Sequence, residues 1–102
     1  MSLSISNRKC LSTLAVADQK QFAAAGEELG LTSGTMSTNI GRLEKDLGFP
    51  VFERGTPGSH GNQITLTPGG KDVVRILRRM AKAYRELEEI SLQNRGVVRG
   101  ES

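Results

Sequence analysis

The feature of this sequence that most constrains its fold is the short break Gly30-Leu31-Thr32 between two helix-like segments. Residues 22–29 (FAAAGEEL) are rich in Ala, and Gly30 is suited to end a helix because glycine adopts the left-handed cap conformation without a steric penalty. Thr32 or Ser33 can then cap a following helix with its hydroxyl oxygen. The break therefore predicts two helices, over residues 22–29 and about 33–47, joined by a tight turn.

The second of these helices has an apolar stripe and an unusual polar face. Its apolar residues Met36, Ile40, Leu43 and Leu47 follow at helical spacing and form one buried stripe. The opposite side and its shoulders carry glycines, hydroxyl residues and two basic residues: Gly34, Thr35, Ser37, Thr38, Gly41, Arg42 and Lys45. A glycine costs roughly 1 kcal/mol relative to Ala in a helix interior, so this face suits the close approach of a backbone or a duplex. The alternative is a solvated polar face that tolerates glycine.

The remaining segments predict one more helix, a hairpin and a long final helix. Leu11, Leu14 and Ala15 repeat at helical spacing and indicate a first helix over about 8–17. The β-prone runs 51–54 (VFER) and 63–67 (QITLT) flank a Gly-rich loop, which is typical of a β-hairpin. Thr67-Pro68 is a good helix start, and the apolar residues that follow have heptad character as far as about residue 93.

Together these elements predict a mainly α fold with a small β-hairpin, a winged helix-turn-helix followed by a long C-terminal dimerisation helix. We divide the chain into a winged helix-turn-helix domain at 1–67, a linker and dimerisation helix at 68–94, and a flexible tail at 95–102. In this architecture the second helix of the pair enters the major groove of DNA and the hairpin flanks it along the backbone.

The final helix is longer than so small a domain can cover. We therefore expect its apolar residues to pair two copies of the chain in a homodimer. The residues predicted for this contact are Leu77, Met80, Tyr84, Leu87 and Ile90. The alternative is a stripe that covers only the domain's own core, and we expect this for its beginning, from Val73 to Leu77. The basic residues Arg75, Arg78, Arg79 and Lys82 form either a solvated face or a contact with flanking phosphates.

Charge and composition limit the classes of function. Residues 1–67 carry six basic and six acidic side chains, and residues 68–102 carry eight and five, so the net charge of +3 lies in the last third of the chain. DNA binding by the first part would therefore depend less on bulk charge than is usual. We expect no enzyme activity, no cofactor and no metal, because one His and one Cys offer no constellation for chemistry. The sequence has no apolar run long enough for a membrane span.

Cys10 is the only cysteine of the chain, which excludes an internal disulfide and fits a reducing cytoplasm. We interpret it as a small apolar residue of the first helix.

Residues 22–54 resemble the DNA-binding domain of the LysR-type transcriptional regulators of bacteria. The shared order is a Phe that opens an Ala-rich helix, then E-x-L-G-L-T-S, then S-x-x-I-x-x-L-E-x-x-L-G-x-P-x-F-x-R, and later L-T-x-x-G. The resemblance extends over about residues 8–92. It implies a winged helix-turn-helix with a linker helix that pairs two subunits, and double-stranded DNA as the partner.

The resemblance also implies which residues contact DNA. Base and phosphate contacts are expected at the start of the third helix, from Ser33, Gly34, Thr35, Ser37 and Thr38. Arg42 and Arg54 are expected to reach the DNA backbone. The family often has Gln-Pro in place of Ser33-Gly34 and Arg in place of Thr38, and the loss of that Arg predicts weaker or differently directed binding.

The hairpin departs most from the family pattern. Its loop, from Gly55 to Thr65, is several residues longer than usual, and in this it is closer to the N-terminal domain of the molybdate-responsive regulators. His60 is a candidate contact to phosphate or to the minor groove, although a lone His in such a loop is more often simply solvated.

LysR-type regulators carry a C-terminal effector-sensing domain, and no small-molecule effector domain is present in these residues. The chain is either a piece of a longer regulator or a free-standing domain. We therefore expect a sequence-specific DNA-binding transcriptional regulator. The alternative is a protein-interaction modulator that dimerises through its C-terminal helix with another regulator.

Overall fold

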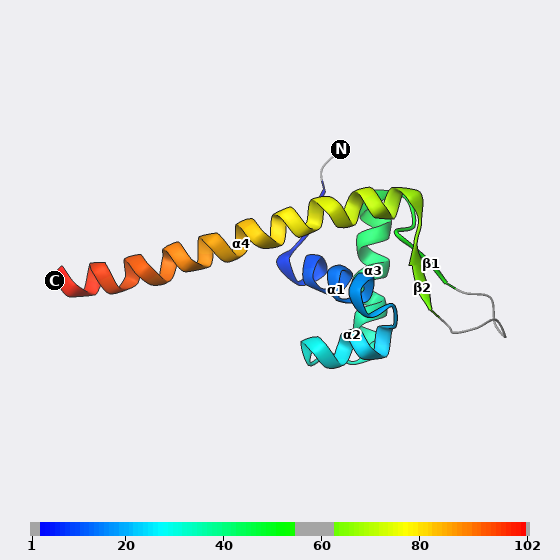
Figure 1. Cartoon of the computed structure of the whole chain (residues 1–102), viewed down its shortest axis with the longest axis horizontal. Coiled ribbons are helices and arrows are strands. Elements are labelled where there is room, and N and C mark those ends of the chain that lie inside the picture. The colour runs from blue at the N-terminus through cyan, green and yellow to red at the C-terminus, as the bar shows by residue number, and fades with distance from the viewer. Residues whose placement is uncertain (1–2, 55–62, 102) are drawn as a thin grey trace.

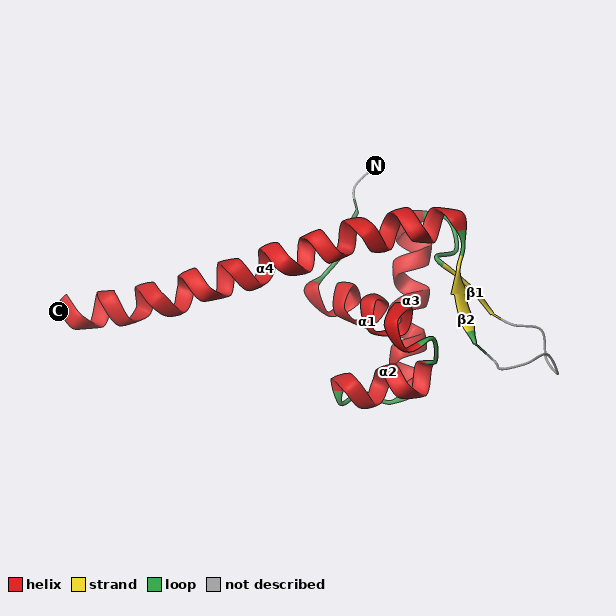
Figure 2. Ribbon diagram, in the orientation of Figure 1, coloured by secondary structure: helices red, strands yellow, loops and turns green. Residues whose placement is uncertain are grey.

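The computed structural model describes residues 3–54 and 63–101, with side chains as far as residue 95. The described residues form four helices and a two-stranded antiparallel hairpin (Figure 1, Figure 2). The elements are α1 (Asn7–Gln19), α2 (Phe22–Leu29), α3 (Ser33–Leu47), β1 (Phe52–Arg54), β2 (Ile64–Leu66) and α4 (Pro68–Glu101). The predicted bounds of α2 and α3 are confirmed, and so is the predicted hairpin.

Local chemistry explains where the first three helices begin and end. The hydroxyls of Ser6 and Thr32 cap α1 and α3 by accepting a backbone N–H of the first turn. Gly30 and Gly48 end α2 and α3 in the left-handed conformation. Lys20 ends α1 in the same conformation, at φ 62°, although a residue with a Cβ is strained there.

The hydrophobic core lies where α1 packs against the other three helices. All four helices contribute buried apolar side chains, and those of α3 follow the predicted spacing. Val51 and Phe52 at the start of the hairpin and Ile64 of β2 complete the core. The fully buried large side chains are Met36, Ile40, Leu43, Leu77, Val16 and Val51. Cys10 is also buried in this core, so its interpretation as a small apolar residue of α1 is confirmed.

Two polar side chains of α1 lie inside this core with satisfied hydrogen bonds. The hydroxyl of Thr13 donates to the carbonyl of Lys9 at 2.8 Å. Asn39 of α3 donates to the hydroxyl of Ser12 at 3.2 Å, which fixes α3 against α1. Both hydroxyl residues are fully buried, so neither leaves an unpaired group that would destabilise the fold.

The hairpin lies beside α3 and pairs Phe52 with Leu66, Glu53 with Thr65 and Arg54 with Ile64. The backbone N–H of Ile64 also donates to the carbonyl of Lys20 at 3.0 Å. This bond ties the hairpin to the corner between α1 and α2. His60 lies outside the described residues.

The final helix α4 begins on the domain and then projects beyond it (Figure 1). Val74 and Leu77 are buried in the core, and Ala81 is the last residue of α4 that is partly buried against it. Leu77, expected among the dimer contacts, is only 2% exposed, because its helical position places it on the stripe that covers α1. The helix runs to Glu101 rather than ending near residue 93, since the glycines that follow weaken a helix without forbidding it.

Candidate nucleic-acid interface

The polar face predicted for α3 is exposed. Ser33, Gly34, Thr35 and Thr38 are all exposed in the first turns of the helix, and Ser37 is half-buried at the shoulder. A Cβ at Gly41 would meet no atom within 4 Å, so the domain itself does not require a glycine there. A glycine that destabilises the helix at this position is explained if another molecule approaches this face closely.

One of the predicted contact residues already has a partner within the domain. Thr32 accepts the backbone N–H of Thr35 at 3.1 Å and donates its own hydroxyl to the Thr35 hydroxyl at 2.9 Å. Among the described residues, the side chains of Ser33, Ser37 and Thr38 have no hydrogen-bond partner. These three hydroxyls are therefore the ones available to an external acceptor or donor.

The exposed face is held rigidly because the opposite face of α3 is buried. Met36, Ile40 and Leu43 are each almost completely inaccessible to solvent. Together with the hydrogen bond from Asn39 to Ser12, they fix the rotation of α3 about its axis. A fixed rotation is what a helix needs if it presents the same side chains to a partner each time.

The C-terminal part of α3 is bonded to the hairpin through Glu44, a contact that the sequence did not predict. One oxygen of this carboxylate, Oε2, accepts the backbone N–H of Val51 at 2.7 Å and that of Phe52 at 3.2 Å. The sequence placed Glu44 one turn before the glycine that ends the helix and within the L-E-x-x-L-G stretch of the family pattern, but neither position indicates which groups it contacts.

The two arginines predicted to reach the DNA backbone differ in their surroundings. Arg42 is exposed on α3. Arg54 is exposed at the end of β1, and its guanidinium carbon lies 4.9 Å from the centre of the Phe22 ring. This cation–π contact joins the hairpin to the start of α2.

The basic residues at the start of α4 are partly neutralised by the chain itself. Arg75 pairs with Asp72 at 3.2 Å, and Arg78 pairs with Asp18 at 2.7 Å, both on the surface. Arg79 and Lys82 are exposed and form no ion pair with any described residue. Of the four basic residues considered for a phosphate contact, these two have the side chains that are free for it.

The buried thiol of Cys10 belongs to the core and not to a reactive site. Its Sγ donates to the carbonyl of Leu77 at 3.4 Å. Burial raises the pKa of this thiol, which keeps it protonated and poorly nucleophilic. Within residues 3–54 and 63–101 the structure contains no cluster of His, Cys, Asp and Glu that could hold a metal ion. None of the described helices is long and apolar enough to cross a membrane.

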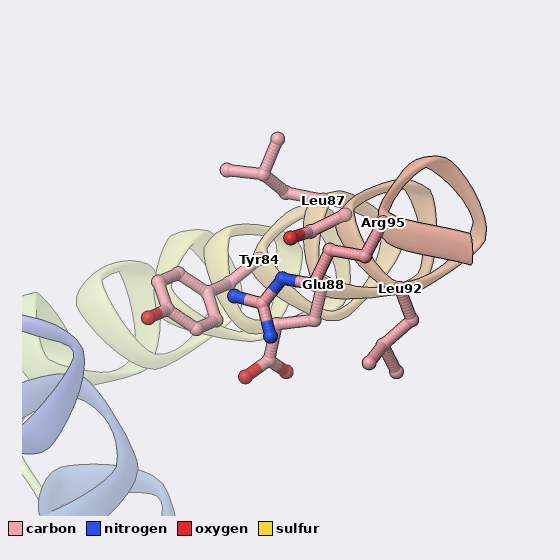
Figure 3. Close-up of a pocket in the computed structure, with 6 residues that line it drawn as sticks. Tyr84, Leu87, Glu88, Leu92 and Arg95 are labelled. Atoms are coloured by element: carbon pink, nitrogen blue, oxygen red, sulfur yellow. The ribbon is translucent and has the colours of Figure 1, made fainter. Parts of the chain in front are cut away.

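The projecting part of α4 carries exposed apolar side chains. Met80 and Tyr84 are 41% and 43% exposed, and Leu87 is 62% exposed. Figure 3 shows Tyr84, Leu87 and Leu92 extending from the helix beside Glu88 and Arg95, which line the same shallow surface. Four of the five predicted dimer residues, Met80, Tyr84, Leu87 and Ile90, are therefore exposed. Met80 and Tyr84 also border a shallow pocket beside Ile5 and Cys10.

The chain matches the family profile described as "Bacterial regulatory helix-turn-helix protein, lysR family" over residues 11–71. It is 35% identical over 86 residues to the RuBisCO operon transcriptional regulator of Allochromatium vinosum, which covers 84% of this chain and 27% of that protein. Relatives such as CzcR of Bacillus subtilis and CmpR of Synechocystis are matched over a similar share, so the chain spans about a quarter of the length of the curated relatives.

Solved structures show the same fold. The structure titled "Crystal structure of CbnR_DBD-DNA complex" superimposes with a TM-score of 0.75 at 27% identity, over 87% of this chain and 97% of that one. The oxidised form of OxyR from Corynebacterium glutamicum superimposes with a TM-score of 0.78 at 19% identity, over 89% of this chain and 28% of that one. At that identity the second likeness concerns the fold alone.

Proposed function

The chain belongs to the lysR family of bacterial regulatory helix-turn-helix proteins, as its sequence resemblance predicted, and we propose that it is a DNA-binding transcriptional regulator. In this proposal α3 enters the major groove of double-stranded DNA and the hairpin lies along the flanking backbone. A bacterial transcriptional regulator acts on DNA in the cytoplasm, so the proposal places the chain there.

The observation that carries this proposal is the outer face of α3. It presents the hydroxyls of Ser33, Ser37 and Thr38 on a helix whose rotation is fixed by a fully buried opposite face. Hydroxyl groups can donate to and accept from both phosphate oxygens and base edges. Gly34 between them and Gly41 after them allow the helix backbone to come close to the duplex.

The relatives support the proposal independently. Several matched proteins are named transcriptional regulators, among them the RuBisCO operon regulator. The similar structures of CbnR_DBD and BenM_DBD are titled as complexes with DNA. The BenM_DBD likeness, at 20% identity, adds support for the fold only.

We further propose that two copies pair through α4. Met80, Tyr84 and Leu87 are apolar or aromatic side chains that remain 41%, 43% and 62% exposed. A second copy of the same segment would bury them, as in an antiparallel helix pair.

The charges along α4 favour the antiparallel orientation. The segment from 75 to 85 contains five basic residues and no acidic one, and the next four residues, 86–89, contain three Glu. Antiparallel pairing brings the acidic segment of one copy towards the basic segment of the other, whereas parallel pairing places like charges together.

The DNA-binding proposal can be tested by fluorescence anisotropy on a labelled mixed-sequence duplex, repeated across about 50 to 300 mM salt. Affinity should fall log-linearly with salt, and Thr38→Glu should weaken binding at least about tenfold because it places a negative charge against the duplex. Gln93→Glu adds the same charge on an exposed part of α4 and should bind as the parent does. Equal affinities for both variants would exclude α3 as the reading helix.

The dimer proposal has its own experiment, sedimentation equilibrium. The parent chain should sediment as a dimer, and Leu87→Glu should shift it towards monomer because a charge would be buried in the pair. The same Gln93→Glu variant is the matched control, since Gln93 lies off the apolar stripe. A parent chain that remains monomeric at tens of micromolar would refute pairing through α4.

The near-neutral charge of residues 1–67 favours one alternative function, a modulator that pairs with another regulator through α4. It predicts dimerisation without measurable DNA binding, even at low salt. Loss of pairing in Leu87→Glu together with no effect of Thr38→Glu would support this alternative.

A further inference from the structure

Val51, which directly precedes β1, and Phe52, the first residue of β1, have backbone N–H groups that the hairpin does not pair. Val51 is fully buried and Phe52 is 8% exposed, so water cannot readily satisfy their N–H groups. Both N–H groups donate to the same carboxylate oxygen of Glu44, at 2.7 and 3.2 Å. A charged acceptor makes these hydrogen bonds stronger than neutral ones.

The carbonyl groups of the same stretch accept hydrogen bonds from Thr67. Thr67, which caps α4, donates its hydroxyl to the carbonyl of Pro50 at 2.7 Å, and its backbone N–H donates to the carbonyl of Val51 at 3.0 Å. The start of β1 is therefore fixed between α3 and α4. Of the two side chains that hold it, only Glu44 comes from the helix proposed to read DNA.

This arrangement sets the position of Arg54. The strand β1 is three residues long, so its direction at Phe52 determines where Arg54 lies. The guanidinium then rests over the Phe22 ring, on the same side of the domain as the start of α2. A change in the direction of β1 would move Arg54 away from this contact.

We propose that Glu44 is a positioning residue for DNA binding, which couples α3 to the hairpin so that Arg54 and the outer face of α3 reach one duplex together. The inference rests on the proposed function. Glu44 touches no DNA in this account and acts through the backbone of Val51 and Phe52.

If Glu44 influenced DNA binding only through its charge, its removal would have the opposite effect on affinity to the one that positioning predicts. A carboxylate near a duplex repels the phosphates, so its loss should strengthen binding if electrostatics were its only influence. Positioning predicts weaker binding, because the hairpin would lose its fixed direction. The two effects differ in sign and can be separated by measurement.

The experiment compares Glu44→Ala, Glu44→Gln and Glu53→Gln in the salt-dependent anisotropy assay. Glu44→Ala removes the acceptor, and we expect about tenfold weaker binding, the loss typical of one charge-assisted contact. Glu44→Gln keeps an amide oxygen in the same place and should restore affinity to within about threefold of the parent chain. Glu53→Gln removes a charge from an exposed residue of β1 and should bind as tightly as the parent or more tightly.

A double-mutant cycle links Glu44 to Arg54. In the parent chain Arg54→Gln should reduce the slope of log affinity against log salt by about one, the change expected for one lost phosphate contact. In the Glu44→Ala background the same change should have little further effect. Additive effects of the two substitutions would show that Glu44 does not act through Arg54 and would overturn the proposal.

Folding is monitored by circular dichroism at the assay temperature. If Glu44→Ala is unfolded there, Glu44→Asp replaces it, because its shorter side chain withdraws the acceptor while keeping the charge. The positioning role is refuted if Glu44→Ala and Glu44→Asp are both unfolded. It is also refuted if whichever of these two variants is folded binds DNA as tightly as the parent chain. A parent chain that does not bind DNA refutes the proposed function instead.

Discussion

Replacing Gly70 by Ala should destabilise this domain, although the same change normally favours a helix. Gly70 lies in the first turn of α4, where the helix crosses the start of β1. A Cβ added there would lie 2.8 Å from the carbonyl carbon of Val51 and closer still to its oxygen. Both contacts are closer than any real Cβ contact and both atoms belong to the backbone, so the backbone of Val51 or of α4 must move.

That movement disturbs bonds as well as packing. The carbonyl of Val51 accepts the N–H of Thr67 at 3.0 Å and its hydroxyl at 3.2 Å. Weakening two hydrogen bonds costs about 0.5–1.5 kcal/mol each, and overpacking adds about 1–3 kcal/mol. The gain in helix propensity returns about 1 kcal/mol. Taking the middle of each range, we expect the free energy of unfolding to fall by about 3 kcal/mol, or the melting temperature by about 12–24 °C.

The neighbouring glycine provides a matched control. A Cβ at Gly69 would also lie 2.8 Å from another atom, but that atom belongs to the exposed ring of Phe49, which can rotate away. Gly69→Ala should change the melting temperature by only a few degrees, roughly the effect of less than 1 kcal/mol. Melting both variants by circular dichroism tests the reasoning. It would be wrong if Gly70→Ala were as stable as Gly69→Ala.

Three further predictions follow from single contacts. Lys20→Gly should raise the free energy of unfolding by roughly 1 kcal/mol, because residue 20 has a φ of 62° that glycine adopts without strain. Lys20→Ala should not raise it, and urea titration of both variants measures the difference. Thr67→Val should lower the free energy of unfolding by roughly 2 kcal/mol, because it removes the cap of α4 and the hydrogen bond to the carbonyl of Pro50. Thr67→Ser keeps the hydroxyl, so its melting temperature should be close to that of the parent chain. Cys10 should react with a thiol reagent far more slowly in the folded chain than in urea at pH 8, because burial raises its pKa; equal rates would contradict its place in the core.

The helices of the reading pair could be predicted from sequence because their signals are local. Gly30 stops one helix, Thr32 caps the next, and the apolar spacing from Met36 to Leu43 identifies the buried side. The polar face then follows as the opposite side. Each of these inferences needs only residues within a few helical turns, and each is confirmed.

The contacts between elements could not be predicted in the same way. The bond from Glu44 to the N–H of Val51 depends on the path that the chain takes after Gly48 and Pro50. The contact of Arg54 with Phe22 joins residues far apart in the sequence and depends on the fold as a whole. Spacing within one helix contains no information about either.

The apolar stripe on α4 is a third case, because one repeat of apolar residues forms both a buried surface against the core and an exposed surface beyond it. Val73, Leu77, Met80 and Tyr84 read as a single heptad stripe, but the core ends within it: Leu77 is buried and Met80 is exposed. Periodicity cannot locate that boundary, because it is set by the size of the domain beneath the helix. This is why the sequence pattern placed Leu77 with the dimer contacts, although its side chain is buried within the domain.

The shared stripe has a consequence for the proposed dimer. Val74 and Leu77 fix α4 to the core that also fixes α3, and the same continuous helix then presents Tyr84 and Leu87 to a partner. The partner is thereby held at a set distance and direction from α3. In a symmetric pair the separation of the two reading helices follows from where along α4 the copies cross. The spacing of DNA half-sites, one helical turn or a multiple of it, would then be a property of residues near Leu87 and not of α3. Moving the crossing point by substitution at these positions should change the preferred half-site spacing without changing the sequence read within each half.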